Sequence, residues 1–417
     1  MTTETLHPQL AVSSEIESGV SSEVFPSKIV NADAAKTLII ETLADFQAIE
    51  ADWDRFMLDV GIHNLSMMHH WLNTWLQHFL QDGRLCTIII RDTNGRWLGV
   101  APFQIMRGRT GYSQRLLRYV QFIGTQPTVF DWMEIAIHPQ ADEQQILSGI
   151  ADSLRQQQRH WDAVDLYFCP HQSHLESLYR FMKPKSDLKA LAAALRESMP
   201  IPWLALPENE EEYLEKRSKK MRLKINRHRN TVRKESGQDA QLVFKPTIPT
   251  AFSQTQALLD TFVEGHINYW QQRNVKSEFS RFPQLPQFYR DVLKQAEPLL
   301  QAGLPAMRFS VLELDGKPMS YQLGFWQGNG YLFHMTHYNH EFERYSPGTL
   351  HTEAIIVDTI QRGGLSFSFG RGDEPYKQLW TKTTQPLWSL RFFHTPLHRF
   401  LWEIDAQLKH ASGRAVL

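Results

Sequence analysis

Residues 328–380 restrict the fold of this chain more than any other segment. A β-prone run with a Gly-Asn-Gly turn leads to a loop with Pro347 and Gly348, and an amphipathic helix is expected at residues 348–361. A Gly-Gly break and an apolar strand at residues 365–369 follow. Because a helix between two strands of one sheet must cover a face of that sheet, the segment predicts an α/β (α+β) unit.

The loop before this helix has the composition of a phosphate site. The first turn of a helix presents free N–H groups and the positive end of the helix dipole, which together bind anions. Ser346 suits the N-cap, Pro347 the first turn, and Gly348 a close approach of a ligand to the backbone. An ordinary helix start uses the same residues, so both interpretations stay open. The residues assigned here to a cofactor are Arg344, Tyr345, Ser346, Pro347, Gly348 and Thr349.

Charged residues collect directly after the last strand of the segment. The run Gly-Arg-Gly-Asp-Glu at residues 370–374 is unsuited to a core, and Tyr376 and Lys377 follow it. Catalytic groups concentrate on loops held by a rigid scaffold. The catalytic candidates are Lys377, beside a developing oxyanion, with Asp373 and Tyr376. The alternative for Lys377 is a surface ion pair with Asp373 or Glu374.

Several histidines invite a functional reading. In a regular strand, His334 and His337 point to opposite faces, so the sequence predicts no metal site. His337 is a candidate general base, because imidazole titrates near neutrality. His266 and Trp270 lie one helical turn apart, with Arg273 next along the same face. That face is either an ordinary packed one or a wall that binds the acceptor substrate.

The length of 417 residues exceeds one ordinary core and predicts two domains. Helices, antiparallel strands, a helix and a strand at residues 163–169 follow one another in residues 37–206, and residues 238–395 repeat that order. Each domain is expected to be a mixed, mainly antiparallel sheet flanked by helices. Residues 1–36 are predicted to be a disordered tail, residues 207–237 a basic linker helix, and residues 396–417 a C-terminal helix or tail.

Composition excludes several classes of protein. The formal net charge of -1 argues against non-specific binding to nucleic acid by the whole chain. Cys86 and Cys169 lie in apolar runs and are expected to be buried, inert thiols. No run reaches the roughly 20 apolar residues of a spanning helix, and no signal peptide is visible. The sequence therefore predicts a cytoplasmic location.

Residues 216–234 hold the strongest concentration of charge. A solvated helix between domains is one interpretation. An electropositive wall for CoA phosphates or a polyanionic acceptor is another, and nucleic acid is the third. The cations are Lys216, Arg217, Lys219, Lys220, Arg222, Lys224, Arg227, Arg229, Arg233 and Lys234.

The motifs together resemble the CelD/BcsL-type acyltransferases, bacterial GNAT-superfamily proteins linked with cellulose and other exopolysaccharide synthesis. The resemblance spans about residues 51–393. Residues 218–222 (SKKMR) resemble the family's S-R-K-x-R, and residues 345–348 (YSPG) its loop before the cofactor helix. The final motif, residues 367–380, is the most specific. Single positions that match are His266, Trp270, Arg273, Phe279, Arg281, Phe282, Arg371, Gly372, Asp373, Glu374, Tyr376, Lys377 and Trp380.

The resemblance implies two tandem GNAT-like domains and direct transfer from acetyl-CoA or another acyl-CoA, without a metal. It implies an acceptor from saccharide or envelope-precursor chemistry, and a polysaccharide-synthesis complex as a partner. Backbone N–H groups of His334, Met335 and Thr336 would hold the oxyanion, and Asp373 or His337 would take the proton. The acceptor would meet His266, Trp270, Arg273, Arg281, Arg371 and Glu374.

Two departures from the family patterns leave alternatives open. Ser368 stands where the family commonly has Asp, and the R-x-x-G-x-G phosphate loop of ordinary GNAT enzymes is absent from the sequence. Tyr376-Lys377 also resembles a pair in Fem-type peptidoglycan aminoacyl-transferases. The alternatives are therefore an aminoacyl- or carrier-dependent transferase, or a catalytically degenerate scaffold.

Overall fold

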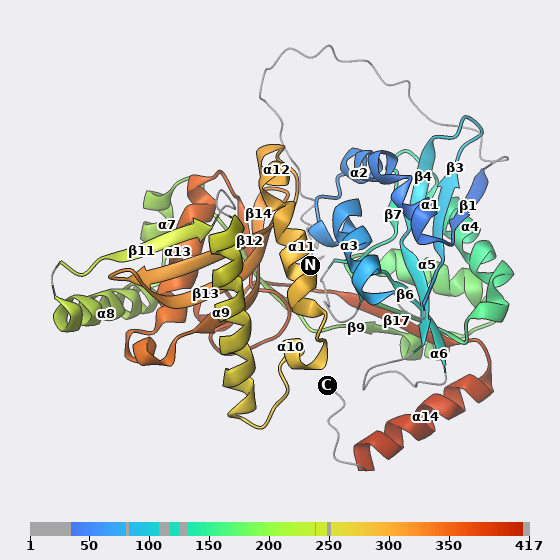
Figure 1. Cartoon of the computed structure of the whole chain (residues 1–417). Helices are drawn as coiled ribbons and strands as arrows, with labels where there is room; N and C mark the ends of the chain where they lie inside the picture. The colour runs from blue at the N-terminus through green and yellow to red at the C-terminus, as the bar shows by residue number, and fades with distance from the viewer. Residues whose placement is uncertain are drawn as a thin grey trace, which may run out of the picture. The chain divides into compact units, whose positions relative to one another are not determined.

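The computed structural model describes residues 35–80, 83–107, 117–125, 132–237, 239–247 and 252–411 (Figure 1). The predicted tail falls almost entirely outside these residues. Within them, the strands form a four-stranded sheet, a six-stranded sheet and a seven-stranded sheet. All three are covered by helices, so the predicted class of mixed, mainly antiparallel sheets flanked by helices is confirmed.

The first half of the chain builds the four-stranded sheet, in the order β1-β3-β4-β7, and most of the six-stranded sheet. Its elements are β1 (Lys36–Ile40), α1 (Leu43–Gln47), α2 (Glu50–Asp59), η2 (Leu65–Met67), α3 (His69–Phe79), β2 (Arg84–Leu85), β3 (Thr87–Arg91), β4 (Trp97–Ala101), β5 (Phe103–Arg107), β6 (Arg118–Phe122), β7 (Ala136–Ile137), α4 (Glu143–Gln156), η3 (Gln158–His160), β8 (Ala163–Cys169), α5 (Gln172–Met182), α6 (Leu188–Ala194) and β9 (Leu195–Glu197).

The second half builds the seven-stranded sheet, in the order β11-β12-β13-β14-β15-β10-β16. Its elements are β10 (Ile201–Ala205), α7 (Glu210–Lys216), α8 (Lys219–Ser236), β11 (Leu242–Thr247), α9 (Phe252–Gln271), α10 (Glu278–Arg281), α11 (Leu285–Lys294), α12 (Ala296–Gln301), β12 (Ala306–Leu314), β13 (Lys317–Gln327), β14 (Gly330–Tyr338), η5 (His340–Tyr345), α13 (Pro347–Gln361), β15 (Ser366–Ser368), η6 (Lys377–Leu379), β16 (Thr384–Gln385), β17 (Trp388–Phe393) and α14 (Pro396–Ala411).

Two strands, β10 and β17, pair outside the domain in which the predicted division at residues 206 and 238 would place them. β10 pairs with β15 and β16 in the seven-stranded sheet. β17 crosses in the other direction and pairs with β8 and β9 in the six-stranded sheet. Neither strand was expected from the sequence. This exchange ties the two halves together through backbone hydrogen bonds, and the expected division at residues 206 and 238 stays a prediction.

The seven-stranded sheet carries helices on both faces, and β12 shows how the sequence assigns them. Because side chains alternate along a strand, Phe309 packs on Phe262 of α9 at 5.8 Å between ring centroids. Leu312 belongs instead to a buried cluster with residues of α8 and α13. Every residue of β12 is buried, as a strand covered on both sides requires.

Helix α8, light green in Figure 1, is the basic segment. Its buried residues Met221, Ile225 and Val232 pack with Tyr345 and Leu350. Most of its basic side chains are exposed. The segment predicted as one linker helix, residues 207–237, is therefore two helices, α7 and α8. α8 lies beside α13 and the loop before it, with most of its charges facing solvent.

β8 has the bounds predicted from the sequence, residues 163–169. β3 and β4 form a hairpin, in which Gly95 has a φ of 86°. Pro102, which has no N–H to donate, separates β4 from β5. β4 pairs in the four-stranded sheet and β5 in the six-stranded sheet. Cys86 and Cys169 are free and buried, as expected.

Candidate active site

The neighbouring strands β14 and β15 pair only at their beginnings. Their parallel register joins Gly330 to Ser366 and ends where Leu332 meets Ser368. Beyond that point the chain after β15 turns to the other side, where the Phe369 N–H donates to the Pro202 carbonyl at 2.9 Å. From Phe333 onward, the backbone groups of β14 on this edge are therefore not paired with β15.

A bulge lies at the same place on the opposite edge of β14. Phe333 is opposite Gly324 of β13 and Met335 is opposite Leu323, so His334 is the extra residue. A bulge residue shifts the alternation of side chains that follow it. The expectation that His334 and His337 face opposite sides is therefore wrong: both rings lie toward the helices α9 and α11.

The two histidines make different contacts on that side. The Tyr289 hydroxyl of α11 is 2.9 Å from His334 Nε2. His337 lies against α9 so closely that a Cβ added to Gly265 would be 2.2 Å from its Nε2. Burial lowers the pKa of His334 to about 3 and that of His337 to about 4. Both imidazoles are neutral at pH 7.

His266, on α9, belongs to the same group. It is buried, and its ring lies 5.3 Å from that of Phe279 in an edge-to-face arrangement. Its Nε2 accepts a hydrogen bond from Trp270 Nε1 at 3.2 Å. Burial, with the nearby charge of His337, lowers the pKa of His266 to about 4. Arg273 stacks over the Tyr269 ring at 3.7 Å, one turn further along.

The loop after β15 is organised by Lys377. Its side chain is buried, and Nζ donates to the carbonyls of Gly370 at 3.2 Å and Arg371 at 2.5 Å. The same nitrogen pairs with the Glu374 carboxylate at 2.9 Å. These three acceptors match the three N–H bonds of an ammonium group. In this structure Lys377 holds the loop together, and its contact with an oxyanion stays a prediction.

Two other groups in this loop have identified positions. Arg371 stacks on the ring of Phe168, a residue of β8, at 3.7 Å. Its charge also contributes to the lowered pKa of His334, which places the guanidinium near the bulge. Asp373 and Tyr376 are exposed. Ser368, at the position where Asp was expected, is buried, and its Oγ accepts a hydrogen bond from the Gly370 N–H at 3.3 Å.

The space around the first turn of α13 is open. Ser346 adopts a left-handed conformation, with φ 54°, and makes no side-chain capping bond, in contrast to the expected N-cap role. Pro347 occupies the first turn, as predicted. A Cβ added at Gly348 would meet nothing within 4 Å. Arg344 pairs with Glu235 of α8 at 2.9 Å and donates to the Tyr345 hydroxyl at 2.8 Å.

The structure brings together part of the predicted site. His266, His334, His337 and Arg371 gather around the bulge of β14. Arg281, which was predicted to meet the acceptor, instead pairs with Glu278 at an exposed position. Sequence reasoning missed Gly265 and Tyr289. The glycine beside His266 was a usable signal, because a glycine inside a helix often marks a close approach.

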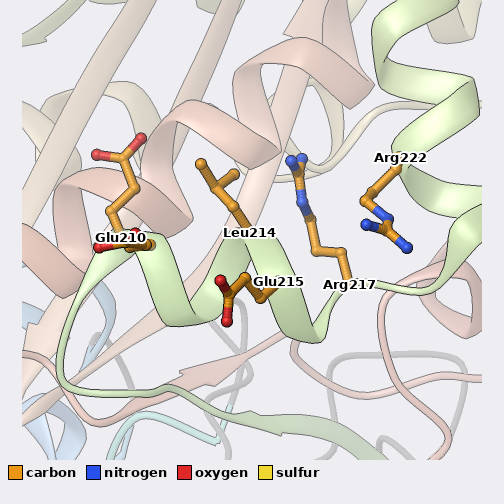
Figure 2. Close-up of a pocket in the computed structure, with 6 residues that line it drawn as sticks. Glu210, Leu214, Glu215, Arg217 and Arg222 are labelled. Carbon is orange, nitrogen blue, oxygen red and sulfur yellow. The ribbon is translucent and has the colours of Figure 1, made fainter.

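A hollow of about 550 Å³ lies apart from these residues, along α7 and the start of α8 (Figure 2). It mixes carboxylates with guanidinium groups on an open surface. Its lining consists of Glu210, Glu211, Leu214, Glu215, Arg217 and Arg222. Within the described ranges, no group of three or more His, Cys, Asp or Glu residues could hold a metal ion. The helices described there include none long and apolar enough to cross a membrane.

Comparison with known proteins identifies the region that contains this geometry. Residues 219–378 match the family described as the acetyltransferase (GNAT) domain. The bulged strand, the α13 start and the Lys377 loop all lie inside that match. No protein of curated function matches the chain. Residues 219–378, which lie in the second half of the chain, are therefore similar to a GNAT-type acetyltransferase domain.

Solved structures give weaker likenesses. At 10% identity and a TM-score of 0.49, 86% of this chain aligns with 97% of the C-terminal domain (DUF2156) of a putative lysylphosphatidylglycerol synthetase from Agrobacterium fabrum. A tandem GNAT protein from the clavulanic acid pathway aligns at 10% identity over 87% of this chain and 99% of its own, with a TM-score of 0.46. FemX aligns at 14% identity over 89% and 100%, with a TM-score of 0.44. Likenesses of this degree carry no argument about substrate.

Proposed function

We propose that this protein transfers an acyl group from acyl-CoA directly to an amine or hydroxyl of an acceptor. The observation that carries the proposal is the divergence of β14 from β15 beside a bulge, inside the segment that matches the acetyltransferase family. Backbone N–H groups freed from a ladder can bind a thioester carbonyl. The open start of α13, beside the basic helix α8, suits the pyrophosphate of CoA.

In the proposed reaction, the acceptor nitrogen or oxygen attacks the thioester carbonyl carbon. A C–N or C–O bond forms, the C–S bond breaks, and the CoA thiolate leaves. The proton of the nucleophile passes to a base and then to the thiolate or to solvent. Asp373, exposed in the Lys377 loop, and His337, neutral at pH 7, are the proposed bases. The chain contributes position and electrostatics, without a covalent intermediate.

The cellular role is proposed on the CelD/BcsL resemblance alone. That resemblance suggests an acceptor from exopolysaccharide, cellulose or cell-envelope biosynthesis. An acceptor of this kind would approach from the side of α9, where Trp270 and Arg273 expose part of their surface.

The test is thiol release from acetyl-CoA with a panel of amine and hydroxyl acceptors that includes amino sugars and oligosaccharides. Release that depends on an acceptor is expected, and Gly348→Trp should abolish it by filling the open space at the α13 start. Lys317→Trp, on an exposed hairpin of the same sheet, is the matched control and should retain it. Release that Gly348→Trp leaves unchanged would contradict the assigned donor site.

A further inference from the structure

His266 has one ring nitrogen whose role the fold determines. The indole N–H of Trp270 can only donate a hydrogen bond. Because it lies 3.2 Å from His266 Nε2, that nitrogen must accept and carries no proton. The ring is neutral at pH 7, since burial lowers its pKa to about 4. The single ring proton of His266 is therefore on Nδ1.

That proton has no acceptor in the part of the chain that the structure describes. Nδ1 of His266 is buried and has no hydrogen-bond partner among the described residues. The rings of Phe262, Phe279 and Trp270 surround the imidazole and supply no oxygen for it. A buried N–H without an acceptor is destabilising, and such groups in native proteins call for an explanation.

The position of His266 distinguishes it from the other histidines that have a buried ring nitrogen without a hydrogen-bond partner. Those found in the described part of the chain are His69, His70, His174, His228 and His398. None of them lies on α9, α11 or α13, helices that contact β14. His351 of α13 is satisfied, because its two nitrogens lie 3.0 Å from the hydroxyls of Ser310 and Ser320.

The surroundings of His266 point to the acyl group as the missing partner. His337, on the bulged strand, lies against Gly265, the residue directly before His266, and His266 is near enough to His334 to influence its pKa, so the His266 ring stands beside the bulge of β14. In the proposed reaction the thioester carbonyl lies at that bulge. Its oxygen gains negative charge as the acceptor attacks, and a fixed neutral N–H donor stabilises that charge without reorganisation.

We propose that His266 is a catalytic residue that donates its Nδ1–H to the acyl carbonyl oxygen of the donor, with Trp270 fixing the tautomer. This inference rests on the proposed function. It differs from the expected wall for the acceptor, because the contact is to the donor thioester. His266 does not act as a base, because Nε2, its ring nitrogen without a proton, already accepts the hydrogen bond from Trp270.

Two measurements on the full chain test the proposal. Nitrogen-15 NMR of histidine-labelled protein at pH 7, assigned with His266→Asn, should show the Nδ1–H tautomer, and Trp270→Phe should release that preference. Difference infrared spectroscopy with carbonyl-13C acetyl-CoA should show the thioester C=O stretch at lower frequency when bound. His266→Leu should lose that shift. His266→Asn should recover most of it, because the Asn amide N–H occupies nearly the position of Nδ1–H.

The controls separate this inference from the proposed function. Unacylated CoA, which lacks the carbonyl, should bind the parent protein and His266→Leu within about twofold, a difference below 0.5 kcal/mol. An Nε2–H tautomer, or an unchanged C=O shift in His266→Leu, would overturn the role of His266 while leaving the donor site intact. Equal loss of acetyl-CoA and CoA binding in His266→Leu would overturn it in favour of a structural role. If neither ligand binds the parent protein, the proposed function fails, and this inference fails with it.

Discussion

Glu353 offers a quantitative test of how the basic segment is attached to the second sheet. Its side chain, on α13, is 0% exposed and pairs with Arg217 and Arg229. The Arg217 side chain is 10% exposed, whereas that of Arg229 is 45% exposed. Arg217 follows α7 and Arg229 lies on α8, so one carboxylate holds both helices.

The difference in exposure sets the expected magnitudes. Glu353→Gln leaves the Arg217 guanidinium buried without a counter-charge, which typically costs about 3–5 kcal/mol of unfolding free energy. Arg217→Met should cost a similar amount, because it leaves the half-exposed Arg229 as the counter-charge of the buried Glu353 carboxylate. Arg229→Met should cost about 1 kcal/mol or less, because water screens a half-exposed ion pair.

The assay is denaturant unfolding followed by tryptophan fluorescence, completed by a double-mutant cycle between Glu353 and each arginine. A coupling energy for Arg217 several times larger than that for Arg229 is expected. Equal couplings, or a cost below about 1 kcal/mol for Glu353→Gln, would refute the reasoning from burial. In that event the apolar contacts of the basic helix with Tyr345 and Leu350 would contribute more to its attachment than the Glu353 ion pairs do.

Three further predictions concern stability. Ser218 caps α8 by accepting the Met221 N–H, whereas Ser346 makes no capping bond, so Ser218→Ala should cost about 1 kcal/mol in thermal unfolding and Ser346→Ala clearly less. Gly265→Ala should cost about 1–3 kcal/mol, because its Cβ meets the His337 ring, while Gly348→Ala meets nothing. Equal effects within either pair would contradict these contacts. Burial lowers several histidine pKa values below the unfolded value of 6.5, so the unfolded chain binds more protons and stability should fall as pH drops from about 6.5 toward 4. Each such histidine contributes a slope of up to about 1.4 kcal/mol per pH unit, and a flat profile would be inconsistent with their burial. These residues are His70, His174, His266, His334, His337 and His351.

The order of elements around α13 was predictable because each depends on local signals. The Gly-Asn-Gly turn, Pro347 and the Gly-Gly break mark where strands and helices end, and periodicity identifies what lies between them. The structure moves these boundaries by a few residues only.

What the sequence could not supply depends on contacts between distant residues. The bulge at His334 follows from the register of β14 against β13, and it reverses which face His337 occupies. The exchange of β10 and β17 joins residues nearly two hundred positions apart, as in the pairing of Trp388 with Glu197. The hydrogen bonds from Lys377 to the carbonyls of its own loop depend on the turn at Gly370. No pattern of residue types in the sequence predicts these hydrogen bonds.

The central claim, that the α13 start and the divergent strands bind an acyl-CoA, is tested most directly by calorimetric titration of the full chain with acetyl-CoA. We predict a dissociation constant in the roughly micromolar range. Gly348→Trp should abolish binding, and Arg344→Ala should weaken it by removing a cation from the edge of that loop. No binding by the parent protein at millimolar acetyl-CoA would contradict the account and point to an aminoacyl or carrier-linked donor, or to a scaffold that has lost the chemistry.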